Sequence, residues 1–309
     1  MTRAFVFPGQ GAQTIGMGRA LADAYPAARA VFEEVDAALG ESLSTLIWDG
    51  DIEALTLTAN AQPALMAASL AAMRALEAEG FAITDAAFVA GHSLGEYSAL
   101  AAAGALSVSD TARLLRIRGT AMQTAVPVGE GAMAALLGLD FATATEIATE
   151  AAQGEVCQAA NDNDPVQVVV SGHRSAVERA VELAKARGAK RALILPVSAP
   201  FHCALMQPAA EIMAEALANV TLNAPRVPLV ANVRAEATSD PALLRALLVE
   251  QVTGSVRWRE SVSWMVAQGV TEFWEIGAGK ALSGMIKRIE RTSTTKAIGT
   301  PEDIAALRA

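Results

Sequence analysis

The chain has 309 residues, of which 52% are hydrophobic and 18% are charged, and its formal net charge is −9. This much apolar surface offsets chain entropy and excludes a disordered protein. A negative chain without a dense run of Lys and Arg is not expected to bind nucleic acid. Two cysteines, Cys157 and Cys203, make neither a disulfide framework nor a metal-ligand pattern, which is typical of a reducing compartment.

The longest uncharged segments, 54–73 and 192–210, contain prolines and several polar side chains. A membrane-spanning helix needs about 20 predominantly apolar residues, so neither segment is expected to cross a membrane. The first apolar run, 4–7, is too short for the core of a signal peptide. These observations favour a cytoplasmic protein without a membrane partner.

The first part of the chain predicts alternating strands and helices. A buried strand at 4–7 ends at Pro8-Gly9, and a glycine-rich loop continues to Gly18. The elements expected next are helices at 19–39 and 63–79, a strand at 86–90, and helices at 94–103 and 110–125, the last with Ser107 or Ser109 as its cap.

Residues 129–197 predict a separate unit. Its expected strands are 133–137, 156–160, 166–170 and 191–195, and its expected helices are 141–153 and 175–187, with a turn at 161–165. The order βαββαβ is that of a ferredoxin-like unit. We therefore expect a small subdomain at 129–197 inserted into a larger domain made of 1–128 and 198–309.

The chain after the insert returns to alternation. It predicts helices at 204–218, 241–252, 257–267 and from 280, and strands at 229–231 and 272–276. Strands alternating with helices indicate an α/β fold with a mostly parallel sheet covered on both faces.

Gly91-His-Ser-Leu-Gly95 matches the G-x-S-x-G pattern between an expected strand and an expected helix. In that context the serine lies on a sharp turn at a helix N-terminus, where free amides favour developing negative charge. Ser93 is therefore the nucleophile candidate. The alternative is a glycine-rich turn with a capping serine.

A serine nucleophile needs a base, and the chain has three histidines. His92 is adjacent to the serine and is expected to point elsewhere, and His173 opens a helix of the insert. His202 is therefore the base by elimination. Cys203 is an alternative nucleophile, although a small buried filler is the commoner role for such a residue.

Arg118 falls in the apolar stripe of the helix at 110–125, close to Leu114 and Met122. Burying a guanidinium without a partner is costly. Arg118 should therefore meet either a structural carboxylate or the anionic group of a ligand, and its fork suits a carboxylate.

The loop at Gly9-Gln-Gly11 follows the first strand, as nucleotide-binding loops do. Position 14 is Thr rather than the third glycine, and no Lys-Ser/Thr pair follows Gly16. A phosphate cradle is therefore disfavoured, and a loop that brings an amide near Ser93 as half of an oxyanion hole stays open.

These residues together resemble the malonyl-coenzyme A:acyl carrier protein transacylases of fatty acid synthesis, along nearly the whole chain. The matching segments are Phe7-Pro-Gly-Gln-Gly-Ala-Gln13, Gly91-His-Ser-Leu-Gly-Glu-Tyr97, Arg116-Ile-Arg-Gly119, Ala160-Asn-Asp-Asn163, Ala199-Pro-Phe-His202, Glu250-Gln251 and Glu275-Ile-Gly-Ala-Gly-Lys280. Each is weak alone, and their order and spacing together are specific.

The resemblance implies an α/β-hydrolase-like large domain and a catalytic dyad of Ser93 and His202. It implies that Arg118 binds the malonyl carboxylate and that the carbonyl of Gln251 orients the histidine. Gln10 and the amide of Leu94 would form the oxyanion hole.

The substrate pocket would include Phe201, His92, Met122 and one or both of Asn161 and Asn163. Phe201 occupies the position that selects the extender unit in the family, and a bulky aromatic there favours malonyl over methylmalonyl groups.

The resemblance also implies a ping-pong transfer from malonyl-CoA to an acyl carrier protein, with no cofactor, and a monomer. Because the carriers of this family are acidic, docking would need local cations. The candidate clusters are Lys185, Arg187, Lys190 and Arg191 in the insert, and Lys287, Arg288 and Arg291 near the end.

Three alternatives remain open from the sequence. The first is a serine esterase or thioesterase, the second a non-catalytic carrier-binding module, and the third a malonyl transferase that serves a polyketide or malonate decarboxylase carrier. The transacylase interpretation itself requires that Ser93, His202 and Arg118 line one common pocket with room for a three-carbon diacid.

Overall fold

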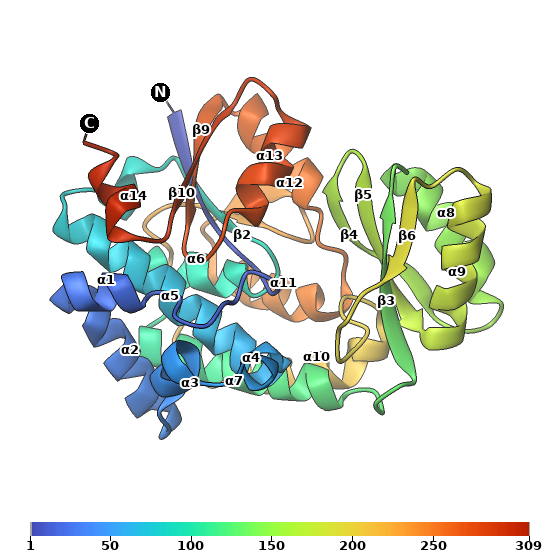
Figure 1. Ribbon diagram of the computed structural model, residues 1–309, viewed down its shortest axis with the longest axis horizontal. Coiled ribbons are helices and arrows are strands. Elements are labelled where there is room, and N and C mark those ends of the chain that lie inside the picture. The colour runs from blue at the N-terminus through green and yellow to red at the C-terminus, as the bar shows by residue number, and fades with distance from the viewer. Residues whose placement is uncertain (1, 309) are drawn as a thin grey trace.

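The computed structural model describes residues 2–308 and contains two β-sheets in separate parts of the molecule (Figure 1). One sheet has six strands in the order β10-β9-β1-β2-β7-β8, and the other has four in the order β4-β5-β3-β6. In the larger sheet all pairs are parallel except β7 with β8. The smaller sheet is antiparallel throughout. The predicted α/β class with a mostly parallel main sheet is confirmed.

The main sheet is covered by helices on both faces. Its strands are β1 (Thr2–Phe7), β2 (Phe88–Gly91), β7 (Leu229–Ala231), β8 (Glu236–Thr238), β9 (Val270–Ile276) and β10 (Thr294–Ile298). The surrounding helices are α1 (Arg19–Ala24), α2 (Pro26–Leu39), α3 (Leu43–Asp49), α4 (Ile52–Thr56), α5 (Thr58–Ala78), α6 (Gly95–Ala102), α7 (Val108–Thr124), α10 (Gln207–Ala218), α11 (Pro241–Thr253), α12 (Trp258–Ala267), α13 (Ala281–Ile289) and α14 (Pro301–Ala305). Along β1, Phe5 and Phe7 pack into the core that contains α2, α5 and α7, whereas Ala4 and Val6 pack on the side of α12 and α13.

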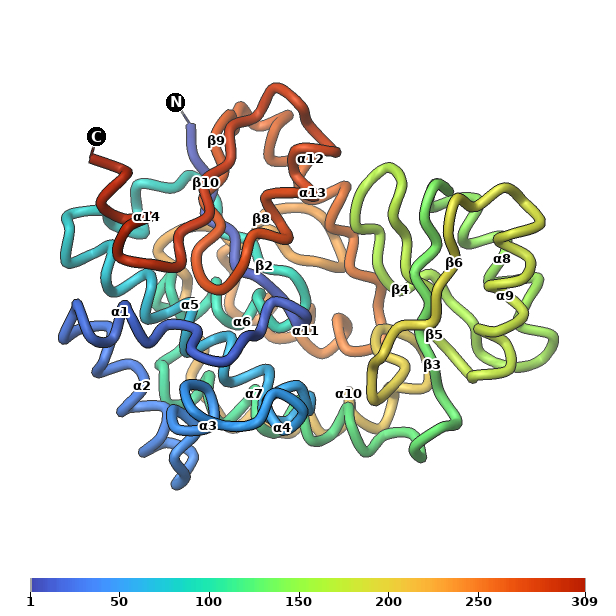
Figure 2. The backbone as a smooth tube through the Cα atoms, viewed as in Figure 1, coloured from blue at the N-terminus to red at the C-terminus, as the bar shows by residue number. Residues whose placement is uncertain are grey.

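The smaller sheet has its own helices and its own core. Its elements follow the chain as β3 (Gly131–Leu137), α8 (Phe141–Ala152), β4 (Cys157–Asp164), β5 (Gln167–His173), α9 (Arg174–Ala186) and β6 (Arg191–Ile194), which is the predicted βαββαβ order. Ile147, Val168 and Val177 are fully buried in its core. The chain enters this unit after α7 and returns to the larger part at α10 (Figure 2).

Several predicted elements were wrong. The helix expected at 19–39 is two helices, because Pro26 has no amide to donate and starts α2. The turn expected at 161–165 is strand as far as Asp164, where β4 ends, and the turn itself begins at Pro165. Strands β8 and β10 and helices α3, α4 and α14 were not predicted. Between residues 2 and 308, the structure contains no helix with the length and apolar character to span a bilayer.

Candidate active site

Ser93 lies on the sharp turn between β2 and α6, in the strand–turn–helix context that its motif predicts. Its φ of 52° is in the left-handed region, where a residue with a side chain is strained. The flanking glycines permit the turn. A Cβ on Gly91 would lie 1.9 Å from the carbonyl carbon of Gly95, and one on Gly95 would lie 2.2 Å from the oxygen of Phe7.

His202 is the histidine that lies within hydrogen-bond distance of the Ser93 hydroxyl. Its Nε2 lies 2.8 Å from Ser93 Oγ, and its Nδ1 lies 2.9 Å from the main-chain oxygen of Gln251. Because a carbonyl can only accept, Nδ1 carries the hydrogen and Nε2 is left to accept from the serine hydroxyl. Burial, followed by the positive charge of Arg118, lowers the pKa of His202 to about 3. The imidazole is therefore neutral, as a general base must be.

The other basic and nucleophilic candidates lie elsewhere or have other contacts. His173 accepts a hydrogen bond from the amide of Val156 through Nδ1 at 2.9 Å, at the start of α9. Cys203 donates to the carbonyl of Pro200, and burial raises the pKa of its thiol. His92 faces the same cavity as Ser93, where its Nε2 lies 2.8 Å from Asn163 Oδ1.

Arg118 lies on α7 and is 1% exposed, as its place in the apolar stripe predicts. Nη1 donates to Gln62 Oε1 at 2.8 Å, and Nη2 donates to Gln251 Oε1 at 2.8 Å and to Ser93 Oγ at 3.1 Å. All three acceptors are neutral. Among residues 2–308 no carboxylate forms an ion pair with this guanidinium, so the structural ion pair considered from the sequence is absent.

The amides of Gln10 and Leu94 border the cavity beside the serine. Within residues 2–308 neither amide has a hydrogen-bond acceptor, which leaves both able to donate to a ligand. The loop that carries Gln10 packs tightly on the serine turn, because a Cβ on Gly9 would lie 2.7 Å from the oxygen of His92. The side-chain amide of Gln10 donates to Thr58 Oγ1 at 3.2 Å.

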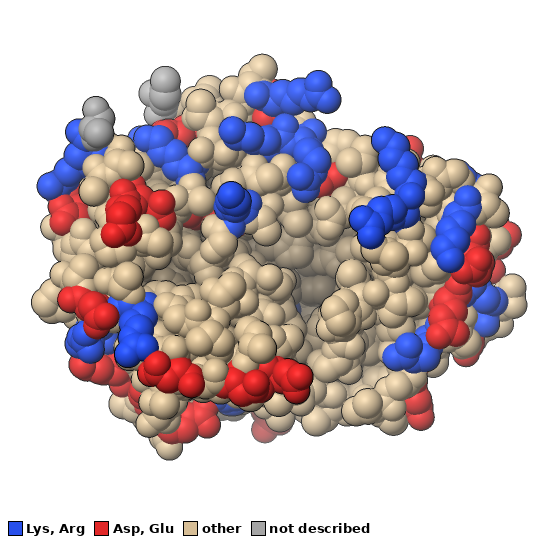
Figure 3. Space-filling model, in the orientation of Figure 1, with Lys and Arg blue, Asp and Glu red and all other residues tan. Residues whose placement is uncertain are grey.

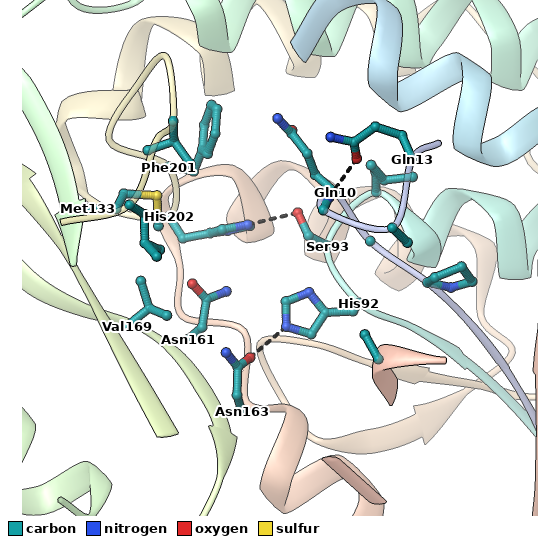
Figure 4. Close-up of a pocket in the computed structure, with 18 of the residues that line it drawn as sticks. Gln10, Gln13, His92, Ser93, Met133, Asn161, Asn163, Val169, Phe201 and His202 are labelled. Atoms are coloured by element: carbon teal, nitrogen blue, oxygen red, sulfur yellow. Dashed lines mark hydrogen bonds between the residues drawn. The ribbon is translucent and has the colours of Figure 1, made fainter. Parts of the chain in front are cut away.

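These groups surround a cavity of about 440 Å³ between the two sheets (Figure 4). Its lining includes all the predicted site residues except Gln251, namely Gln10, His92, Ser93, Leu94, Arg118, Met122, Asn161, Asn163, Phe201 and His202. Gln251 lies behind this wall, fully buried, and reaches the site through its contacts with Ser93, Arg118 and His202. Apart from Gln251, the residues predicted for the site therefore lie around a single cavity.

The sequence analysis missed a set of buried polar residues that support the site. Asn232 Oδ1 accepts from the amide of Ser93 at 2.8 Å, and its Nδ2 donates to the oxygen of Gly91 at 2.7 Å. Gln62 and Glu96 are also buried and contact Arg118 and Gln251, respectively. A polar residue inside an apolar helical run was the available signal for Gln62. Asn232, in contrast, follows a short strand with no local signal.

No group of three or more His, Cys, Asp or Glu side chains within residues 2–308 is arranged to hold a metal ion. The chemistry that the described residues supply is a serine with a neutral imidazole base, two free amides and a buried cation. This set can form an acyl-serine and stabilise an oxyanion.

Comparison with known proteins agrees with acyl-serine chemistry. The model of the acyl transferase domain matches residues 4–301. The chain is therefore an acyltransferase and belongs to the acyl transferase family.

Within that family its relatives are malonyl CoA-acyl carrier protein transacylases. The protein of that name from Escherichia coli K12 is 49% identical over 98% of this chain and 97% of its own length. That from Bacillus subtilis is 49% identical over 97% of this chain and 94% of its own.

Solved structures similar to this chain carry names of the same kind. An acyl-carrier-protein-S-malonyltransferase from Bartonella henselae has a TM-score of 0.97 and 58% identity, covering 100% of this chain and 99% of that one. A malonyl-transacylase in complex with its type II polyketide synthase acyl-carrier protein has a TM-score of 0.96 and 42% identity, covering 99% and 98%.

Proposed function

We propose that this acyltransferase moves a malonyl group from malonyl-CoA to the phosphopantetheine thiol of an acyl carrier protein, for fatty acid biosynthesis. One observation carries the proposal: Ser93 Oγ lies 2.8 Å from His202 Nε2 and 3.1 Å from Arg118 Nη2, at the wall of one cavity. A nucleophile, its base and a buried cation without a direct ion-pair partner together suit an acyl group that ends in a carboxylate.

In the first half-reaction, His202 Nε2 accepts the proton of Ser93 as Oγ bonds to the thioester carbon. The amides of Gln10 and Leu94 donate to the resulting oxyanion. The carbon–sulfur bond then breaks, the protonated imidazole returns its proton to the departing coenzyme A sulfur, and a malonyl-serine ester remains. The hydrogen bond from Nδ1 to Gln251 holds the ring for both proton transfers.

In the second half-reaction the carrier thiol gives its proton to His202 and attacks the ester. Breaking the bond from carbon to Ser93 Oγ regenerates the hydroxyl with that proton. Hydrolysis would waste the intermediate, so the site must exclude water while it waits for the carrier. His202 and Arg118 are buried, and apolar side chains such as Met122 and Phe201 line the cavity, which supports this requirement.

Arg118 would bind the free carboxylate of the malonyl group. Its partners Gln62 and Gln251 hold the guanidinium without neutralising it, so its charge is available to the substrate in a buried setting where ion pairing is strong. Phe201 lines the same cavity and would disfavour the branched methylmalonyl group.

We also propose a division of the chain into an α/β-hydrolase-like domain, 1–128 and 198–309, and a ferredoxin-like insert, 129–197. The strand order β4-β5-β3-β6 with antiparallel pairing supports the second description. The location that we propose is cytoplasmic, which the two cysteines without a disulfide framework support. A monomer that works without a cofactor is proposed from the family resemblance.

For carrier docking the structure favours the cluster of Lys287, Arg288 and Arg291. Lys and Arg side chains gather along the upper rim of the hollow in Figure 3, whereas Asp and Glu side chains lie along its lower edge. Helix α13 carries the first two of these cations and also lines the cavity through Met285. Arg288 pairs with Asp164, so Lys287 and Arg291 are the cations of this cluster proposed for docking. In the insert, Lys185 pairs with Glu182, and Arg187 with Glu146 and Glu150.

Intact-protein mass spectrometry tests the function directly. After mixing with malonyl-CoA, we expect one adduct of the malonyl mass on Ser93, which disappears when a phosphopantetheinylated carrier is added. Rapid release of free malonate without transfer would favour an esterase or thioesterase, and no adduct at all would favour a binding module. Carriers from fatty acid, polyketide and malonate decarboxylase systems, compared side by side, identify the preferred acceptor.

A further inference from the structure

Glu96 is a buried carboxylate that the transfer chemistry above does not use. It lies in the first turn of α6, three residues after the nucleophile, and is 1% exposed. Its Oε2 accepts from the side-chain Nε2 of Gln251 at 2.7 Å and from the amide of Asn232 at 3.2 Å. Burying a carboxylate is costly, so its presence here calls for a physical reason.

The contacts of Gln251 supply that reason. Its Nε2 donates to Glu96 Oε2 at 2.7 Å and to the main-chain oxygen of Ser93 at 2.9 Å, and its Oε1 accepts from Arg118 Nη2 at 2.8 Å. If the amide turned over, its oxygen would face two acceptors and its NH2 group would face the guanidinium. The acceptor oxygen of Glu96 therefore fixes the amide orientation that Arg118 requires.

The serine turn is held mainly by Asn232, whose own amide donates to Glu96 Oε2 at 3.2 Å. Asn232 bonds the amide of Ser93 and the carbonyl of Gly91 through its side chain. The imidazole of His202 is held by the main-chain oxygen of Gln251, which is part of α11. The Gln251 side chain links Glu96 both to Arg118 and to the main-chain oxygen of Ser93. Of these two links, only the one to Arg118 is specific to a substrate that carries a carboxylate.

We propose that Glu96 is a positioning residue for malonyl transfer, which acts through the Gln251 amide to place the Arg118 guanidinium for the substrate carboxylate. This inference rests on the proposed function. It requires Glu96 to matter for the malonyl group and much less for an acyl group without a carboxylate.

Three variants separate this role from a merely structural one. Glu96→Ala removes the acceptor, Glu96→Asp keeps the charge but withdraws it from Gln251, and Glu96→Gln keeps a carbonyl acceptor of the original length. Glu272→Ala is the matched control, because Glu272 is a buried glutamate paired with Arg3 on the main sheet outside the cavity lining. Each is assayed for transfer from malonyl-CoA and from acetyl-CoA, with thermal unfolding measured in parallel.

For Glu96→Ala and Glu96→Asp we expect the malonyl to acetyl ratio of kcat/KM to fall about tenfold, mainly through a higher KM for malonyl-CoA, since a hydrogen bond to a charged group is lost. Glu96→Gln should restore the ratio to within about threefold of wild type, because an acceptor of the same length is back in place. Glu272→Ala should leave the ratio unchanged.

The inference is overturned if malonyl and acetyl transfer fall equally in the two damaging variants, or if a folded Glu96→Gln protein is as impaired as Glu96→Asp. The aspartate comparison holds even if the alanine variant does not fold. Wild-type protein that fails to load malonyl would remove the proposed function itself, whereas normal loading with no effect at position 96 would remove this inference alone.

Discussion

The guanidinium of Arg118 donates directly to the hydroxyl of Ser93, with Nη2 and Oγ 3.1 Å apart. Because the cation contacts the nucleophile, the acyl group of the serine ester must be short if its far end is to pair with Arg118. Short dicarboxylic acyl groups match this spacing. The contact also means that substrate must replace a hydrogen bond already present in the free enzyme.

Replacing Arg118 with Ala should lower malonyl transfer by about a hundredfold or more, because the carboxylate loses its only buried cation. Acetyl transfer should change much less. Parallel kcat/KM measurements with both thioesters check this. Equal losses for the two substrates would show that Arg118 serves the fold or the nucleophile instead.

Replacing Gln62 with Glu should give Arg118 an anionic partner at Nη1, where Gln62 Oε1 now lies at 2.8 Å. The internal ion pair would compete with the malonyl carboxylate and raise the KM for malonyl-CoA by about tenfold or more. Gln62→Met, which keeps the side-chain length without a charge, is the matched control. Its KM should rise less, and the reverse order would contradict the argument.

Replacing Phe201 with Ala should widen the cavity and raise the methylmalonyl to malonyl ratio of kcat/KM by about tenfold, as expected for room for one methyl group. Competition between the two thioesters, read as the mass of the serine adduct, measures the ratio. An unchanged ratio would place the selectivity elsewhere in the lining.

Two buried groups make stability depend on pH in opposite directions. Burial raises the pKa of Glu96 from 4.5 to about 7, so the folded state binds more protons between these values, and this contribution to stability is lost as pH rises through 7. The pKa of His202 is lowered from 6.5 to about 3, so its contribution is lost as pH falls below 6.5. The two effects oppose each other between 4.5 and 6.5.

Glu96→Gln removes the first effect and keeps the second. Its melting temperature relative to wild type should therefore rise from about pH 4.5 to about pH 7 and level off above that. The titratable groups that act on Glu96 are Arg118 and Tyr97. Burial raises the pKa of Tyr97 above its ordinary value, away from this window. Burial lowers the pKa of Arg118, but a guanidinium stays protonated in proteins. A difference that stays constant with pH would contradict a titrating Glu96.

Reversing the charges of Lys287 and Arg291 together should raise the KM for the carrier about fivefold or more, with a steeper loss at low salt, because docking is electrostatic. The matched control reverses Lys185 and Arg187 on the outer side of the insert. If the control impairs the carrier step more than the α13 variant does, the docking surface lies on the insert.

The sequence was sufficient to predict those site residues that have a local sequence signal. Ser93 stands in a short motif, Arg118 interrupts the apolar stripe of one helix, and His202 remained after two other histidines were set aside. Glu96 and Asn232 are different. Their partners are 136 to 155 residues away along the chain, and no periodicity marks them. Contacts of that range exist only once the main sheet has assembled.

The sequence analysis predicted a turn at the polar end of β4, and this prediction was wrong for a related reason. Asn161 to Asp164 has the composition of a turn, but every side chain finds a partner or a cavity on another element. Asp162 pairs with Arg259 of α12, and Asp164 with Arg288 of α13. Only tertiary contacts make a strand of four polar residues stable.

Side chains of β4 alternate between two destinations. Asn161 and Asn163 line the cavity, and Asp162 and Asp164 reach arginines of the larger part. Because the alternation has a period of two, inserting or deleting a single residue just before Asn161 would exchange the destinations. Two carboxylates would then face the carboxylate of the incoming malonyl group while two arginines lost their counterions. The register of this strand is thus a condition for activity.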